Sequence, residues 1–423
     1  MKISKVVGYQ VLDSRGRPTV AAAISLSDGS THTARVPSGA STGAHEAKEL
    51  RDHGSTYADK FYAGQSVFQA IERINKVIAP KIIGKEIELK EIDNLLQELD
   101  PSNDHSILGA NATLAVSLAA SMASAHSLNL SLARYFQPNS PLTIPMPMVN
   151  ILSGGAHANR VMDIQDLLII PIGATTFTQA LSWIVAIREK SAELGKLSGH
   201  VTNLIADEGG LAIHFDQIEK ACDFVISAIE KVGLVVGKDI GLALDIAATQ
   251  FFSNNSYNLN NANKTYSPDQ FVKFIHDLVV NHPIISIEDP FAEDDWQSWR
   301  NFMEISPKKL QVIGDDLLTT NLDRLNRAID EKCTNSILIK ANQNGLVSST
   351  LEVLKHARKN NFNTVVSARS GENEDSWLAD LAVGWGADQI KVGSTHGSER
   401  NSKWNRLLEL EITEDTRFIN PFN

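Results

Sequence analysis

The region after residue 235 repeats one pattern, in which a short apolar run ends in a polar residue and an amphipathic segment follows. The apolar runs occupy residues 241–245, 284–289, 311–316, 336–340, 364–370 and 389–391. The amphipathic segments occupy residues 269–280, 296–305, 322–331, 346–359 and 375–384. Strand-length runs that alternate with helical periodicity predict βα units on a parallel sheet. Because most units recur about every 25 residues, the pattern favours a closed βα barrel over an open sheet.

The first third of the chain follows a different pattern. Residues 5–12 and 19–27 are rich in strand-forming residues, and a Ser-Asp-Gly hairpin signal closes the second run. Residues 66–99 and 111–133 have the periodicity and composition of helices. These elements predict a small α+β unit that precedes the barrel.

The Pro-containing segment 137–141 is typical of a linker between domains. We therefore predict an α/β protein with a smaller α+β N-terminal cap domain at 1–138 and a βα barrel domain at 139–423. The second range has the length expected of one barrel.

The composition narrows the class of protein. Of 423 residues, 43% are hydrophobic and 21% are charged, which is ordinary for a globular chain. The net charge is −11, from 39 basic and 50 acidic residues, which argues against nucleic acid as the main partner. Cys222 and Cys333 are too few for a disulfide scaffold, and we recognise neither a secretory leader nor a membrane-spanning apolar run. We therefore expect a cytoplasmic protein without a membrane span.

Three carboxylates stand at the ends of successive apolar runs, namely Asp245, Glu288 and Asp315. In a βα barrel the C-terminal strand ends meet at the face where catalysis takes place. Hard oxygen donors without His or Cys suit Mg²⁺ better than zinc. Each carboxylate alone could instead cap the helix that follows it, because the helix dipole favours an anion there. The position shared by all three favours a metal site.

Lys340 and Lys391 end two further runs, and Arg369 and Ser370 follow another. A buried lysine near a metal ion is expected to have a lowered pKa, which suits a general base. Either lysine could instead be a structural counter-ion of the carboxylates. Arg369 with Ser370 could hold a phosphate, because a guanidinium matches phosphate oxygens bidentately. Together these groups predict proton abstraction next to a carboxylate, with the metal stabilising the resulting enolate.

A series of short motifs runs in order along nearly the whole chain. They are LDSRG at 12–16, VPSGASTG at 36–43, ELRD at 49–52, LGANATLAV at 108–116, NIL at 150–152, GGAHAN at 154–159, DEGG at 207–210, SIEDP at 286–290, GDDL at 314–317, LIKANQ at 338–343, SGE at 370–372 and KWNRL at 403–407. No single motif is specific, but this series closely resembles the enolase family. The resemblance implies a cap domain, a barrel that begins irregularly with an antiparallel strand, and a hydro-lyase that dehydrates 2-phosphoglycerate to phosphoenolpyruvate in glycolysis.

The resemblance also implies roles for individual residues. Asp245, Glu288 and Asp315 would hold the first of two Mg²⁺ ions. Ser41, in the Gly/Ser-rich loop, would help bind the second ion when substrate closes the site. Lys340 would remove the C2 proton of 2-phosphoglycerate.

The remaining roles concern proton transfer to the leaving group and substrate binding. Glu208 would help the C3 hydroxyl leave, with Asp166 and His157 in the same catalytic group and His157 beside the phosphate. The substrate-binding residues would be Lys391 at the carboxylate, Arg369 and Ser370 at the phosphate, and Ala40 and Ser41 in the loop.

Several positions depart from the enolase pattern. Ala368 stands where the family has His before Arg-Ser-Gly-Glu, and Asp166 stands where it has Glu. Gln250 replaces Glu, Leu211 replaces Phe and Asn373 replaces Thr. We expect Ala368 and Asp166 on the side that handles the C3 hydroxyl, where the loss of an acid–base group costs about 10²–10⁴ in rate.

The departures leave three functions open. The chain could be a working enolase with slower or rearranged chemistry, or an enolase-like paralogue that acts on a related phospho- or phosphono-acid with altered C3 chemistry. It could also be a non-catalytic binding or scaffold protein, although the intact metal ligands and lysines weigh against that. The resemblance further predicts a homodimer or a larger homo-oligomer.

Overall fold

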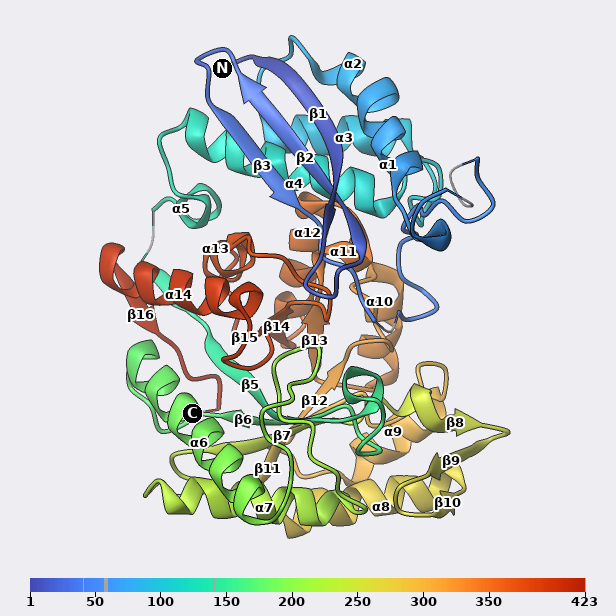
Figure 1. Cartoon of the computed structure of the whole chain (residues 1–423), viewed down its shortest axis with the longest axis vertical. Coiled ribbons are helices and arrows are strands. Elements are labelled where there is room, and N and C mark those ends of the chain that lie inside the picture. The colour runs from blue at the N-terminus through green and yellow to red at the C-terminus, as the bar shows by residue number, and fades with distance from the viewer. Residues whose placement is uncertain (41, 57–59, 140, 423) are drawn as a thin grey trace.

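The chain forms an N-terminal domain and a barrel domain, which occupy the two ends of the long axis of the molecule (Figure 1). This computed structural model describes residues 1–40, 42–56, 60–139 and 141–422. In the N-terminal domain, the antiparallel sheet consists of β1 (Ile3–Leu12), β2 (Pro18–Leu26) and β3 (Thr31–Arg35) in that order. The predicted hairpin is confirmed, with Gly29 at a φ of 89° that glycine adopts without steric cost.

The helices of this domain are shorter than the sequence predicts. The segment 66–99 contains α1 (Phe68–Glu72), η2 (Arg73–Ile78), α2 (Ala79–Ile82) and α3 (Leu89–Leu99). The segment 111–133 contains most of α4 (Ala110–Ser127) and the start of α5 (Leu132–Phe136), and η1 (Tyr62–Gly64) precedes them all. Both predicted helices are interrupted where the backbone takes a positive φ, at Gly84 (87°) and at Asn129 (56°), because a right-handed helix cannot continue through that conformation.

The second domain is a closed barrel, as predicted. In order round the barrel its strands are β11 (Ile284–Glu288), β12 (Gln311–Gly314), β13 (Ser336–Ile339), β14 (Asn363–Ser367), β15 (Gln389–Lys391), β5 (Met146–Ser153), β6 (Asp166–Ile170) and β7 (Gly241–Asp245). Each of the six predicted apolar runs forms one of these strands. Only β6 runs antiparallel to its neighbours among them, which confirms the irregular start.

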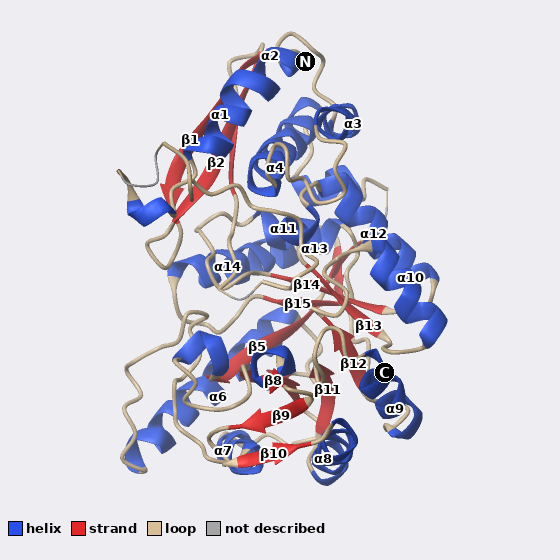
Figure 2. Ribbon diagram, turned by 90° about the vertical axis from the view of Figure 1, so that its right-hand side faces the viewer, coloured by secondary structure: helices blue, strands red, loops and turns tan. Residues whose placement is uncertain are grey.

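Helices surround this barrel (Figure 2). They are α6 (Phe177–Leu197), α7 (Ile218–Lys231), α8 (Pro268–Asn281), α9 (Trp296–Ile305), α10 (Leu322–Glu331), α11 (Ala341–Asn344), α12 (Val347–Lys359), α13 (Trp377–Gly384) and α14 (Ser398–Thr413), with the short turns η3 (Gly155–Ala158) and η4 (Ala248–Phe251). Small sheets join β8 (Phe252–Ser253), β9 (Ser256–Leu259) and β10 (Lys264–Tyr266), and β4 (Leu142–Ile144) with β16 (Thr416–Phe418). The described part of the chain contains no helix whose length and apolar character would suit a membrane crossing.

The barrel interior explains where polar side chains gather. Its packed layer consists of Met146, Met148, Leu168, Ile170, Ala243, Ile313, Leu338 and Val365. Side chains alternate between the two faces of a strand, so a residue two positions further on points inward again. Four polar residues lie two positions beyond an inward-pointing residue of this layer, and the alternation places them at the C-terminal mouth of the barrel. They are Asn150 after Met148, Asp245 after Ala243, Asp315 after Ile313, and Lys340 after Leu338.

The N-terminal domain is attached to this mouth. Ser38 and Gly371 exchange both backbone hydrogen bonds at 2.9 Å, which joins the loop after β3 to the loop after β14. A Cβ atom at Gly371 would lie 2.6 Å from the Ser38 carbonyl oxygen, so the two backbones approach too closely for any other residue. Both domains therefore contribute walls to the space above the strand ends.

Candidate active site

The strand ends bring Asp245, Glu288 and Lys391 into direct contact. Asp245 ends β7 and Glu288 ends β11, and the pairing of these strands sets the two residues side by side. The Lys391 Nζ atom donates to Asp245 Oδ2 at 2.8 Å and to Glu288 Oε2 at 2.7 Å. All three side chains are buried, so the ammonium group offsets two carboxylates that would otherwise repel each other.

Asp315 and Lys340 form a second carboxylate–lysine pair at the same face. The Lys340 Nζ atom donates to Asp315 Oδ2, and Gln343 Nε2 donates to Asp315 Oδ1 at 2.9 Å. Asp289 fixes the turn that carries Asp315, because its carboxylate accepts the backbone N–H groups of Asp315 and Asp316 at 2.8 and 2.7 Å. The predicted metal ligands and the predicted lysines thus lie together.

These charges shift one another's pKa values. Burial, and then Asp245, raise the pKa of Glu288 well above its ordinary value. Burial opposes the charge of Asp315 too, but Lys340 outweighs it and lowers the pKa of that carboxyl. Burial also disfavours the Lys340 ammonium, yet Asp315 outweighs it and raises the pKa of the lysine. Among the described residues the direct partner of Lys340 is a carboxylate, which raises the pKa, and the lowering expected beside a bound metal ion stays a prediction.

The donor chemistry fits a divalent cation. Asp245, Glu288 and Asp315 offer only hard oxygen ligands, which Mg²⁺ prefers, and the mutual repulsion of buried carboxylates favours added positive charge. In the structure the two lysine ammonium groups hold these oxygens. In the described ranges, two groups of three acidic or histidine side chains have ligand atoms within 4.8 Å of one another, namely Asp289, Asp315 and Asp316, and His157, Asp166 and Glu208.

The antiparallel part of the barrel carries a second buried group. The His157 Nδ1 atom lies 3.0 Å from Asp166 Oδ2, and His157 Nε2 lies 3.6 Å from Glu208 Oε1. Ser153 Oγ donates to Asp166 Oδ1 at 2.5 Å, and Asn150 Nδ2 donates to Glu208 Oε2 at 3.1 Å. The predicted residues Asp166, His157 and Glu208 therefore form one connected chain, supported at each end by an uncharged side chain.

This second group holds a proton on His157. Burial opposes the imidazolium, but Glu208 and Asp166 outweigh it and raise the pKa of His157 to about 9. Burial raises the pKa of Asp166, against the pull of His157. Burial would also raise the pKa of Glu208, but His157 and the cations around it lower it. At neutral pH the group is therefore an imidazolium between two carboxyl side chains.

Arg369 and Ser370, the predicted phosphate ligands, face the N-terminal domain. Arg369 Nη1 and Nη2 donate to the two carboxylate oxygens of Glu46 at 2.9 and 3.2 Å. Ser370 Oγ accepts the Ala40 backbone N–H at 2.6 Å, so the predicted loop residue Ala40 does lie at the site. Ser41, predicted to bind metal and substrate, lies outside the described residues.

Sequence reasoning missed several residues that hold these groups. Glu46 follows the Gly/Ser-rich loop and faces Arg369. Arg400, which is buried, donates to the carbonyl oxygens of Arg369 and Ser370 at 2.7 and 2.6 Å. Gln165 Nε2 donates to Asp245 Oδ2 at 3.0 Å. None of these residues ends an apolar run, so the pattern of strand ends could not point to them. Their proximity in sequence to a recognised motif was the signal that could have found them.

The departures from the enolase pattern occupy buried or half-buried positions. The Ala368 N–H donates to the Lys391 carbonyl oxygen at 2.8 Å, and the residue is 5% exposed. Leu211 is fully buried beside β5. The Asn373 carbonyl oxygen accepts a hydrogen bond from the buried Lys403 ammonium. Ala368 therefore lies next to the site, whereas Leu211 and Asn373 support the structure around it.

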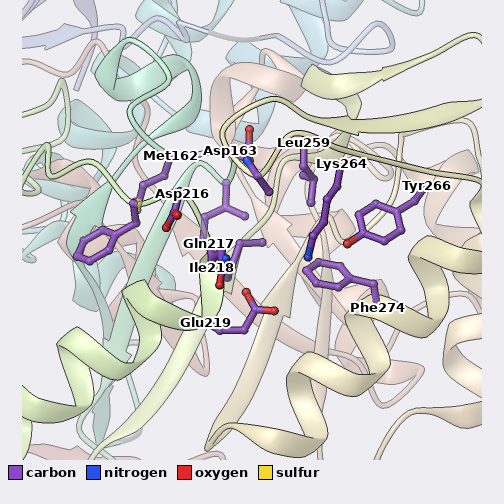
Figure 3. Close-up of a pocket in the computed structure, with 13 residues that line it drawn as sticks. Met162, Asp163, Asp216, Gln217, Ile218, Glu219, Leu259, Lys264, Tyr266 and Phe274 are labelled. Carbon is purple, nitrogen blue, oxygen red and sulfur yellow. The ribbon is translucent and has the colours of Figure 1, made fainter.

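Two clefts differ in their relation to this site. One is lined by His157, Asp207 and His214, and it reaches the His157 group from the surface. The other lies beside the start of α7 and is lined by Met162, Ile218 and other side chains (Figure 3). The second cleft contains none of the predicted site residues.

Comparison with known proteins covers both domains. Residues 3–136 match the family model "Enolase, N-terminal domain", and residues 141–419 match "Enolase, C-terminal TIM barrel domain". A curated protein named Enolase from Wolinella succinogenes is 42% identical over 411 residues, which is 97% of this chain and 96% of that protein. Another Enolase, from a Nitratiruptor species, is 42% identical over 410 residues, with the same coverage. The chain belongs to the enolase family.

Proposed function

We propose that this protein is a phosphopyruvate hydratase, a lyase that reversibly dehydrates 2-phosphoglycerate to phosphoenolpyruvate in glycolysis. The observation that carries the proposal is the meeting of three carboxylates, two lysines and the His157 group at one barrel mouth. Membership of the enolase family supports the same reaction, and it implies dependence on Mg²⁺.

The reaction breaks a C–H and a C–O bond and forms a double bond. Lys340 takes the proton from C2 as a neutral amine, so it first has to give up the proton that it donates to Asp315. The electron pair of the broken C–H bond moves into the substrate carboxylate. The C3–O bond then breaks as the C2–C3 double bond forms, and the hydroxyl leaves as water after it takes up a proton. Glu208 assists this departure, and the proton that His157 shares with Glu208 and Asp166 is available on that side.

Substrate binding is assigned to the cations around the mouth. Lys391 contacts the substrate carboxylate, and Arg369 with Ser370 contacts the phosphate, beside His157. Ala40 and Ser41, in the Gly/Ser-rich sequence 36–43, are also assigned to substrate binding. For Arg369 to bind a phosphate, its guanidinium has to share or exchange its contact with Glu46.

Asp245, Glu288 and Asp315 would hold Mg²⁺, and Ser41 would contribute to a second ion. When bound, Mg²⁺ supplies positive charge that stabilises the negative charge developing on the substrate carboxylate. We further propose the domain ranges 1–138 and 139–423, from the Pro-containing segment 137–141, and a cytoplasmic location, from the composition. A homo-oligomer is proposed from the resemblance to enolases.

Ala368 and Asp166 favour a second candidate, an enolase-like enzyme that forms the same carbanion but handles C3 differently. One experiment separates the two. The purified protein is incubated with 2-phosphoglycerate and Mg²⁺ in D₂O, while the phosphoenolpyruvate chromophore and C2 proton exchange are followed. Turnover with exchange supports phosphopyruvate hydratase, and exchange without product supports the second candidate. Absence of both signals, and of thermal stabilisation by Mg²⁺, contradicts both and points to a non-catalytic protein.

A further inference from the structure

A line of hydrogen bonds joins the loop that carries His157 to Asp245. The Ala156 N–H donates to Gln250 Oε1 at 3.1 Å. The other end of that amide, Gln250 Nε2, donates to Gln165 Oε1 at 2.6 Å. Gln165 Nε2 then donates to Asp245 Oδ2 at 3.0 Å. We call these bonds the amide relay.

The two ends of the amide relay fix its direction. A backbone N–H can only donate, so the atom of Gln250 that faces Ala156 must be its oxygen. The nitrogen of Gln250 is therefore turned to Gln165, which has to present its own oxygen there. Gln165 is left with its nitrogen toward Asp245, and a carboxylate can only accept. Each amide therefore has one orientation that satisfies both of its neighbours.

The relay spans three separate parts of the barrel mouth. Gln250 lies in η4, just beyond β7, which ends at Asp245. Gln165 immediately precedes β6, and Ala156 lies in η3 beside His157. Gly155 lets the η3 loop approach, because it has a φ of 43° and a Cβ atom there would lie 3.2 Å from Gln250 Oε1. The loop is thus packed directly against the relay.

The relay and Lys391 act on the same oxygen. Lys391 Nζ and Gln165 Nε2 both donate to Asp245 Oδ2, at 2.8 and 3.0 Å. Two donors from separate segments of the barrel mouth fix the rotation of the carboxylate about its χ2 angle, which is otherwise soft. A carboxylate whose orientation is fixed before a ligand arrives loses less conformational freedom when it binds a cation.

We propose that Gln250 is a positioning residue, which orients the carboxylate of Asp245 through Gln165 and ties it to the loop that carries His157. In the described part of the chain Gln250 makes no hydrogen bond to Asp245 or His157, so it acts through Gln165 and Ala156. The role in metal binding rests on the proposed function, whereas the ordering of the loop does not.

The test uses Gln250→Met and Gln165→Met, separately and together, in the full-length protein. Methionine has a similar length but makes none of the amide hydrogen bonds. Gln250 is half-buried and lines a cleft with Arg160 and Asn261, so the site has room for the change. Gln97→Met, at an exposed position of α3, is the matched control. Should Gln250→Met not fold, Gln250→Asn replaces it, because the shorter amide cannot span both partners.

Two readouts are used. The first is Mg²⁺ affinity without substrate, from the rise in melting temperature during a Mg²⁺ titration. We expect Gln165→Met to weaken affinity by about 10-fold, as for other residues that orient a metal ligand. We expect Gln250→Met to weaken it by about 3- to 10-fold, as for loss of one net hydrogen bond. The second readout is hydrogen exchange of the Ala156 amide, which should accelerate in Gln250→Met and not in Gln97→Met.

The double variant decides between positioning and an independent structural effect. If Gln250 acts through Gln165, the double variant binds Mg²⁺ no more weakly than Gln165→Met alone. Additive losses, or wild-type affinity in Gln250→Met, would overturn the proposal. If the wild-type protein gains no stability from Mg²⁺, the proposed function is contradicted instead. The amide relay is then tested by hydrogen exchange of the Ala156 amide alone, and an unchanged exchange rate in Gln250→Met would contradict it.

Discussion

The barrel mouth has two halves that are built differently. On the parallel half, β7, β11, β12, β13 and β15 each end at or just before a charged residue, and carboxylates and lysines from these strand ends pair directly. On the antiparallel half, the charged residues come from the start of β6 and from loops, and polar side chains such as Ser153 and Asn150 support them. The comparison teaches that a repeated βα unit brings charges together through the register of its strand ends, whereas the irregular half brings them together through loops. Polar side chains orient the charges in both halves.

The largest effect is expected from Lys340→Ala on the parallel half. Removal of a general base typically costs up to about 10⁴-fold in rate, so C2 proton exchange and dehydration should both be lost. Thermal stabilisation by Mg²⁺ should persist, because the carboxylates remain. Lys355→Ala, at an exposed position of α12, is the control. Exchange that survives in Lys340→Ala would show that another group is the base.

Glu208→Gln changes the antiparallel half and should separate the two steps. The glutamine oxygen can still accept from Asn150, so the position keeps its support while losing its charge. We expect dehydration to fall by about 10²- to 10³-fold while C2 exchange continues. The ratio of the dehydration rate to the C2 exchange rate is measured from chromophore formation and proton exchange in D₂O. Equal losses in both signals would mean that the two halves do not divide the chemistry.

The pH dependence of stability should also come from the antiparallel half. His157 has a pKa of about 9 in the folded chain, against an ordinary value near 6.5, so its charge stabilises the fold fully below pH 6.5. That contribution is lost as the pH rises through 9, by about 1–3 kcal/mol. Urea denaturation at pH values from 6 to 10 should show a steeper decline for the wild type than for His157→Gln. Parallel declines would contradict this account of the imidazolium.

The smallest effect is expected from Ala368→His, next to Lys391. If the protein is a hydratase slowed by the missing histidine, the change should raise dehydration by about 10-fold, toward the lower end of acid–base effects. Position 368 is buried, so the larger ring also costs about 1–3 kcal/mol of stability. Steady-state kinetics with circular dichroism as a check of folding measures both. A folded variant without any gain would argue against a role for that position in slowing the enzyme.

The two halves also differ in what the sequence could predict. Asp245, Glu288, Asp315, Lys340 and Lys391 end apolar runs, so periodicity alone brings them to one face, and the structure places them there. His157 and Glu208 have no such register, and only the resemblance to a family pointed to them. The site residues of the antiparallel half were therefore predicted from the resemblance to a family, and those of the parallel half from the periodicity of the apolar runs.

Other features were beyond reach because they depend on contacts distant in sequence. Glu46 and Arg369 are 323 residues apart, and no local pattern relates them. The carboxylate that raises the pKa of Lys340 is Asp315, 25 residues away, and the apolar runs alone do not show that the two side chains form a direct pair. The helix breaks at Gly84 and Asn129 depend on single backbone conformations that helical periodicity does not report.

The contact between Glu46 and Arg369 has a consequence for how this protein can change over evolutionary time. The barrel carries a deeply buried guanidinium whose facing carboxylate belongs to the other domain. A barrel recombined with a foreign N-terminal domain would inherit the positive charge without the acid that matches it. Exchange of domains between relatives is therefore constrained, and the two halves of the gene are expected to vary together at these positions.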